Sequence, residues 1–118
     1  MLEINSVELA TNYVAASNAH DLEKIETMLA PDAVYHSERV GDHEGKESIC
    51  QMMEGFFAEF PDVHWDVGDY VRDGENGVAF RFFMTATEAR SGQRIEREGL
   101  ERIFFSFARK IARVEVKS

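Results

Sequence analysis

The segment over residues 13–45, YVAASNAHDLEKIETMLAPDAVYHSERVGDHEG, constrains the fold more than any other part of the chain. Its periodicity predicts an amphipathic helix, a break, a short second helix and then one strand. The first helix begins before this segment, where Asn5 and Glu8 resemble a capping box. Asp21 is placed to cap the second helix, and Pro31 stops it. The inner face of that second helix is expected at Leu22, Ile25, Met28 and Leu29.

After this segment the hydrophobic period changes from that of a helix to that of strands. Gly45 opens a third helix with a wide apolar stripe, which Pro61 ends. Residues 73–77, DGENG, are typical of a hairpin turn. Strands are expected over residues 33–37, 63–71, 78–86, 94–107 and 110–117, with a polar loop over residues 38–44. The element order α-α-β-α-β-β-β-β predicts one α+β domain over residues 1–118, with the helices on one face of the sheet.

Charge and hydropathy exclude several classes of partner. The chain has 118 residues, 13 Lys and Arg against 22 Asp and Glu, and a net charge of -9. A negative field of this size repels phosphate backbones and anionic lipid, so we expect no nucleic acid and no membrane partner. No apolar run approaches the ~20 residues of a membrane span, and the first ten residues do not resemble a signal peptide. We therefore expect a cytoplasmic protein.

Several short motifs follow one another in an order that a known superfamily shares. They are YVAA at residues 13–16, NAHDL at 18–22, MLAPDA at 28–33, Gly45, FPD at 60–62 and FARKI at 107–111. With these motifs the chain resembles the nuclear transport factor two superfamily, in particular its SnoaL-like polyketide cyclase and ketosteroid isomerase branches. The resemblance implies a cone-shaped barrel, in which three N-terminal helices pack on a strongly curved, mainly antiparallel sheet. It specifies the activity poorly, because the superfamily hosts many reactions.

The resemblance carries over only part of an isomerase site. Tyr13 stands where the isomerases have a tyrosine that donates a hydrogen bond to the developing oxyanion. The position of their general base is occupied by Ser37, followed by Glu38, and that of their second oxyanion acid by Ile103. Two of the three isomerase groups are therefore missing, which argues against classical steroid isomerisation.

Histidine and tyrosine side chains are the first candidates for acid–base chemistry. His36 lies at the end of the first strand, and an imidazole titrates near neutral pH. Strand alternation leaves open whether His36 or its neighbours Tyr35 and Ser37 face the pocket. Tyr13 either donates a hydrogen bond to a substrate oxygen or is a core tyrosine whose hydroxyl is bonded within the protein.

The strand over residues 94–107 places two charged residues on an apolar face. Arg97 and Glu101 share this face with Ile95, Gly99, Ile103, Phe105 and Phe107. If the face points inward, the two charges form either a buried ion pair or part of the lining of a pocket. Glu101 is then an alternative base. The opposite face carries Leu100 and Phe104 among charges, which suits a homodimer contact through the outer sheet face.

Large apolar side chains are expected to surround the ligand. The predicted substrate-binding residues are Phe56, Trp65, Phe82, Met84, Arg97 and Phe105, although most of these residue types also serve in cores. The spacing of His20, His43 and His64 builds no metal site, and His20 is expected in an exposed loop. We expect neither a metal nor a cofactor.

Three functions remain compatible with the sequence. The first is an isomerase, cyclase or lyase that moves a proton on a hydrophobic, carbonyl-bearing molecule without a cofactor. Its base is His36 or Glu101, and Tyr13 is its oxyanion donor. The second is a ligand-binding or dimeric accessory domain without catalysis. The third is a protein-interaction module, which a large apolar patch outside the dimer surface would reveal.

Overall fold

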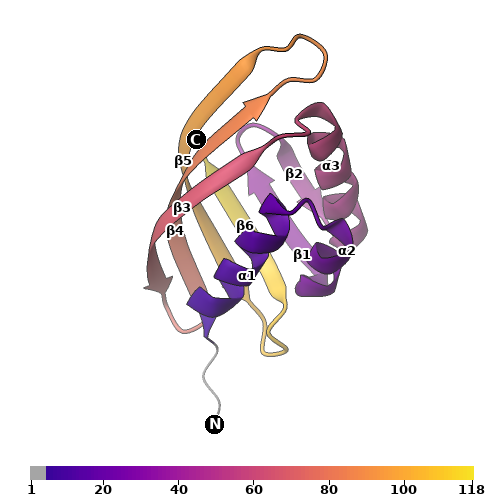
Figure 1. Ribbon diagram of the computed structural model, residues 1–118. Coiled ribbons are helices and arrows are strands. Elements are labelled where there is room, and N and C mark those ends of the chain that lie inside the picture. The colour runs from indigo at the N-terminus through magenta and orange to yellow at the C-terminus, as the bar shows by residue number, and fades with distance from the viewer. Residues whose placement is uncertain (1–4) are drawn as a thin grey trace.

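The computed structural model describes residues 5–118 and has three helices that cover one face of a six-stranded sheet (Figure 1). The elements are α1 (Ser6–Asn18), α2 (Leu22–Met28), β1 (Leu29–Ser37), β2 (Gly41–Glu44), α3 (Lys46–Glu59), β3 (His64–Asp73), β4 (Gly77–Thr87), β5 (Arg94–Phe105) and β6 (Ile111–Lys117). The predicted α+β class is confirmed, and the order contains one strand, β2, that the sequence did not predict. The prediction that no signal peptide is present rests in part on residues 1–4, which lie outside the described residues.

The helix termini follow the capping rules that the sequence suggested. The Asn5 side chain accepts a hydrogen bond from the Glu8 N–H at 3.1 Å and donates one to the Glu8 carboxylate at 3.1 Å. Asp21 caps α2, and its carboxylate accepts a hydrogen bond from the backbone N–H of Lys24 at 3.1 Å. The prediction for Leu29 is wrong, because α2 ends at Met28 and Leu29 already begins β1. Pro31 is accommodated inside β1, where the pairing with β6 shifts register between Leu29 and Val34.

The sheet has the strand order β2-β1-β6-β5-β4-β3. All neighbours are antiparallel except β1 and β6, which are parallel. The β3–β4 pairing also shifts register, between Gly68 and Val71, and there Asp69 has a φ of 59°. Such bulges increase local twist and bend the strands. The sheet remains open, with β2 and β3 at its edges, so the predicted barrel is a curved sheet that does not close.

The predicted polar loop over residues 38–44 is wrong. A turn at residues 38–40 leads into β2, which pairs with β1 from Val34 opposite Glu44 to Ser37 opposite Gly41. This short edge strand is exposed along almost its whole length. Because no side of the strand is buried, its sequence shows no apolar alternation, and the strand depends on backbone pairing with β1.

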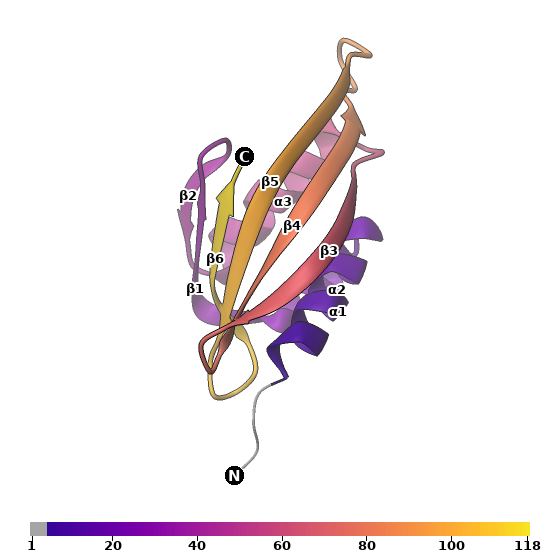
Figure 2. The same cartoon turned by 90° about the vertical axis from the view of Figure 1, so that its left-hand side faces the viewer.

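The core lies between the helices and the inner face of the sheet. The helix α1 packs against β3, β4 and β5, whereas α3 packs against β1 and β2. Figure 2 shows that the helices leave the outer face of β3, β4 and β5 uncovered. Phe107, expected on the inner face, is fully exposed because β5 ends at Phe105 and the chain turns there. Within residues 5–118, no helix is both long and apolar enough to cross a membrane.

Candidate functional site

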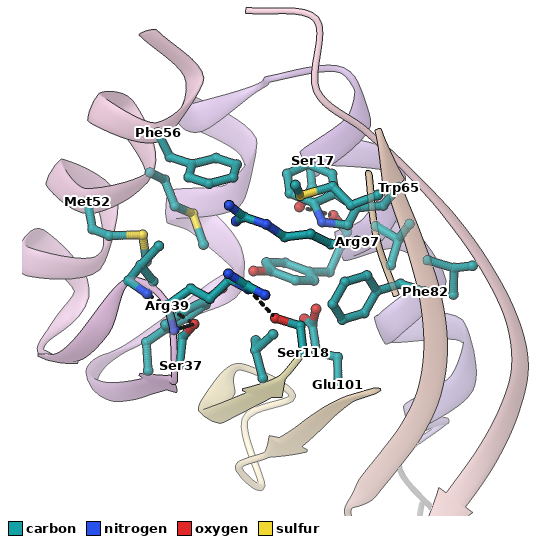
Figure 3. A pocket seen from close by; sticks show the side chains of 18 of the residues that line it. Ser17, Ser37, Arg39, Met52, Phe56, Trp65, Phe82, Arg97, Glu101 and Ser118 are labelled. Atoms are coloured by element: carbon teal, nitrogen blue, oxygen red, sulfur yellow. Dashed lines mark hydrogen bonds between the residues drawn. The ribbon is translucent and has the colours of Figure 1, made fainter. Parts of the chain in front are cut away.

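A pocket opens between α1, α3 and the inner face of the sheet (Figure 3). Seven of the predicted site residues line it, namely Tyr13, Phe56, Trp65, Phe82, Met84, Arg97 and Glu101. Residues that the sequence did not single out as ligand contacts complete much of the wall, among them Ser17, Arg39, Val40, Met52, Met53, Val67 and Ser118. The lining comes from both helices and from five strands or their ends, so only the folded chain brings it together.

His36 does not line this pocket. Alternation along β1 turns its neighbours Tyr35 and Ser37 toward the cavity and His36 to the other side of the sheet. There the His36 Nδ1 atom lies 3.0 Å from an Asp42 carboxylate oxygen on β2, directly opposite in the register. The expectation that His36 is the base at the pocket is corrected accordingly, since β1 directs it away from any molecule bound inside.

Phe105 also lies outside the pocket lining. Its side chain is 2% exposed and belongs to the main core, together with Tyr13, Ile103 and Ile111. Phe105 is the last residue of β5, beyond Glu101 along the strand. It therefore supports the pocket from the core instead of contacting a ligand.

Glu101 is the most unusual group in the pocket. It lies on β5 between Phe80 of β4 and Val116 of β6, and it is 9% exposed. Among residues 5–118, no hydrogen bond or ion pair to its carboxyl group is found. Burial raises the pKa of Glu101 from 4.5 to about 8. A carboxyl group that gains and loses its proton near neutral pH is suited to proton transfer.

The predicted ion pair between Arg97 and Glu101 is not formed in the described part of the chain. Gly99 lies between these two residues on the same face of β5, directly opposite Phe82 of β4. A Cβ atom on Gly99 would overlap the Phe82 ring, so the ring occupies the space above the glycine. In Figure 3 the Phe82 ring lies close to Glu101, whereas the Arg97 side chain extends toward Phe56. The two charged groups are therefore directed to different parts of the pocket.

Two tyrosines accompany Glu101, and we call Tyr13, Tyr35 and Glu101 the floor of the pocket. Burial, followed by the neighbouring Tyr35 and Glu101, raises the pKa of Tyr13 well above 10. Burial and then Glu101 raise the pKa of Tyr35 as well. Both phenols thus keep their protons at neutral pH and can donate hydrogen bonds.

Aromatic side chains form the walls above the floor. Phe56 of α3 stacks on Trp65 of β3, with ring centroids 6.0 Å apart. The side chain of Asn18, at the end of α1, holds the backbone of Trp65. It accepts a hydrogen bond from the Trp65 backbone N–H at 2.8 Å and donates one to the Trp65 backbone carbonyl at 3.0 Å. The sequence did not reveal this contact, because an asparagine in a helix break is equally typical of a turn.

His20 is half-buried, contrary to the expectation of an exposed loop. Its Nε2 atom lies 2.9 Å from the carbonyl oxygen of Val63, and its ring stacks on Phe57 with centroids 4.4 Å apart. Its φ of 55° is in the left-handed region, at the turn between α1 and α2. In residues 5–118, no cluster of three or more His, Cys, Asp or Glu suited to a metal is found.

We call Arg39 and Arg97 the mouth of the pocket, since Arg39 is exposed and Arg97 is partly exposed. Arg39 lies in the turn between β1 and β2, where the Ser37 hydroxyl accepts from its N–H at 3.2 Å. The Arg39 Nε donates to the Ser118 hydroxyl at 2.9 Å. Sequence reasoning missed Arg39 because it assigned this turn to a featureless polar loop. Gly41, with a φ of 85°, was the available signal for a hairpin here.

An open curved sheet, covered on one face by helices that enclose a pocket, defines the class of nuclear transport factor two-like α+β domains. Residues 10–114 match the SnoaL-like domain family, and the chain belongs to that family. The resemblance noted in the sequence is thus confirmed. Searching curated proteins gave no match.

Solved structures agree with this assignment. A cystatin-fold protein from Novosphingobium aromaticivorans is 26% identical, with a TM-score of 0.83 over 96% of this chain and 97% of the other. AclR from Streptomyces galilaeus, a proposed hydroxylase, is 27% identical, with a TM-score of 0.80 over 98% and 90%. RV0760c from Mycobacterium tuberculosis, solved with estradiol-17beta-hemisuccinate, is 14% identical and shares the fold, with a TM-score of 0.84 over 96% and 92%.

Proposed function

We propose that this SnoaL-like domain is a cofactor-independent isomerase, cyclase or lyase that acts on a hydrophobic, carbonyl-bearing molecule. The observation that carries the proposal is Glu101, a buried carboxyl group in the pocket that has no protein partner and a pKa of about 8. A catalytic base is most effective when its pKa lies near the working pH. Tyr13 supplies the hydrogen bond to the substrate oxygen.

The chemistry requires one proton to move away and return. In its ionised form Glu101 removes a proton from the carbon next to the substrate carbonyl, and the electron pair of that C–H bond moves toward the oxygen. Tyr13 donates a hydrogen bond to the resulting enolate oxygen, which carries more charge than the original carbonyl. Glu101, now protonated, returns the proton to another carbon and regenerates the carboxylate. The aromatic walls hold the apolar body of the substrate.

The family and one of its structural neighbours support a small-molecule role. RV0760c was solved with a steroid ester, and it shares the fold of this chain. The pocket here presents Phe56, Trp65 and Phe82 to a bound molecule. These rings suit a flat, apolar skeleton.

A second candidate is a ligand-binding or accessory domain without catalysis, working as a cytoplasmic homodimer. The observation in its favour is Ser37, which lines the pocket at the position where isomerases have their base. A dimer would use the outer sheet face, where Phe83 and Leu100 are 37% and 36% exposed. Sedimentation analysis tests this contact. The wild type should sediment as a dimer and Leu100→Glu as a monomer.

The test of the proposed reaction uses a panel of cyclic β,γ-unsaturated ketones, whose isomerisation is followed by the absorbance of the conjugated product. Glu101→Gln should lower kcat by about 100-fold or more, and Tyr13→Phe by about 10- to 100-fold. For the wild type, kcat should rise with pH up to about 8, where Glu101 becomes ionised. The matched control is His36→Gln, outside the pocket, which should keep full turnover.

Three outcomes would contradict the assignment. Full turnover by Glu101→Gln would remove Glu101 from the reaction. Calorimetric binding of the ketones without any product would favour the ligand-binding alternative. A kcat that falls as pH rises through 8 would mean that Glu101 acts as a proton donor instead of a base.

A further inference from the structure

The mouth of the pocket carries positive charge on a protein that is otherwise acidic. The chain has a net charge of -9, yet Arg39 and Arg97 both line the same opening. Figure 3 shows their side chains directed into the space between α3 and the sheet. In the described part of the chain, neither guanidinium forms an ion pair with a carboxylate. By contrast, Arg113 pairs with Glu115 at 2.6 Å and Arg102 lies 3.8 Å from Asp73.

The positive charges of the two guanidiniums repel each other. Burial, and next the charge of Arg39, lower the pKa of the Arg97 guanidinium. Glu59 of α3 acts in the opposite direction but forms no ion pair with it among the described residues. A guanidinium does not lose its proton near neutral pH, so both charges persist. An anion placed between them would relieve this repulsion.

The nearby acidic groups do not supply that anion. Glu101 in the floor is mostly protonated at neutral pH and forms no ion pair with Arg97 in the described part of the chain. Glu38, next to Arg39, accepts a hydrogen bond from the Ser118 N–H at 3.2 Å. The mouth therefore presents positive charge to whatever enters, directly above an apolar wall.

We propose that the pocket selects amphiphilic carboxylates, with the carboxylate bound by Arg39 and Arg97 and the apolar body held among the aromatic walls. This inference rests on the proposed function for the location of the site, and it names the substrate class. A planar guanidinium presents parallel N–H donors that match the two oxygens of a carboxylate. The reacting carbonyl then lies deeper, toward Tyr13 and Glu101.

The experiment compares naphthalene-2-carboxylate with naphthalene-2-carboxamide, which have the same ring system but differ in charge. Isothermal titration calorimetry at pH 7 and low salt measures both Kd values. The wild type should bind the carboxylate about tenfold more tightly, the size expected for a charge-assisted hydrogen bond. Arg97→Gln and Arg39→Gln should each remove most of this preference and change the amide Kd by less than about twofold. Arg97→Lys should retain part of the preference for the carboxylate. The lysine keeps the positive charge but lacks the two parallel N–H donors of a guanidinium.

Arg90→Gln is the matched control, since Arg90 is exposed in the turn after β4 and does not line the pocket. It should leave the preference unchanged. Equal binding of amide and carboxylate by the wild type, or no binding of the carboxylate, would overturn the proposal. An equal loss in Arg90→Gln would overturn it too, because the effect would then come from net charge. The preference should persist in Glu101→Gln, so a failure of catalysis and a failure of carboxylate selection are distinguishable.

Discussion

In the described part of the chain, the charged groups at the floor and at the mouth of the pocket both lack a protein partner of opposite charge, and they respond in opposite ways. At the floor, burial destabilises the charged form of Glu101 and raises its pKa to about 8, so the carboxyl group keeps its proton at neutral pH. At the mouth, Arg39 and Arg97 keep their charges and remain partly in contact with water. One cavity thus offers a nearly neutral, buried end and a cationic, partly exposed end. The difference predicts that an amphiphilic ligand enters with its apolar end first.

The largest expected effect concerns the floor. Between pH 4.5 and about 8 the folded protein holds a proton on Glu101 that the unfolded chain releases. The free energy of unfolding should therefore fall as pH rises through this window. Each unit of pKa shift corresponds to about 1.4 kcal/mol, so the total loss should reach several kcal/mol. Glu101→Gln should remove this loss and be more stable than the wild type at pH 9.

Urea unfolding of both proteins at a series of pH values measures this effect. Glu98→Gln is the control, because Glu98 lies on the same strand and is exposed. It should leave the slope against pH unchanged. A wild-type protein whose stability does not fall between pH 5 and pH 8 would show that burial does not raise the pKa of Glu101, and the contrast with the mouth would disappear.

A smaller effect is expected where the Phe82 ring lies over Gly99, between Arg97 and Glu101 along β5. In Gly99→Ala the new methyl group would overlap this ring and the carbonyl oxygen of Lys117. Displacement of either should cost about 1–3 kcal/mol in the free energy of unfolding. It should also push the ring into the pocket and weaken binding of naphthalene-2-carboxylate.

Gly68→Ala is the control for this substitution, since its Cβ would meet no atom within 4 Å. Thermal unfolding compares the two variants, and an equal change in both would show that loss of a strand glycine, not the Phe82 contact, is responsible.

The smallest effect is expected at the mouth. Arg39→Gln and Arg97→Gln should change the free energy of unfolding by less than about 0.5 kcal/mol, in the direction of greater stability, because each removes a like-charge contact. Urea unfolding at low and high salt measures the change in the free energy of unfolding. High salt should diminish any gain in stability, because it screens the repulsion between the two charges. A loss above about 1 kcal/mol in either variant would mean that the guanidinium charges stabilise the fold, contrary to like-charge repulsion at the mouth.

Local signals predicted much of the fold. The Asn5–Glu8 cap, the Asp21 cap and the hairpin at residues 73–77 each depend on residues close in sequence, and all are present in the structure. The edge strand β2 was missed because it buries no face and so has no period. The end of α2 was misplaced by the assumption that Pro31 marks a helix end, when a register shift accommodates it in a strand.

The candidate site was predictable only in part. Alternation along a strand correctly placed Arg97 and Glu101 on one face, but it could not say which of Tyr35 and His36 points inward. Arg39 belongs to a turn whose position depends on the pairing of β1 with β2. Its place at the pocket follows from contacts between distant segments.

The sequence by itself determined the family, the helices with their caps, and the alternating strands, because these depend on short-range periodicity and on residues that favour particular backbone angles. Tertiary structure alone decided that Glu101 has no partner among residues 5–118, that Arg97 extends away from it, and that Arg39 joins Arg97 at the mouth. The physical reason is that the pKa of a carboxyl group and the pairing of a charge depend on what surrounds them in space. Those surroundings come from five strands and two helices that meet only when the chain folds.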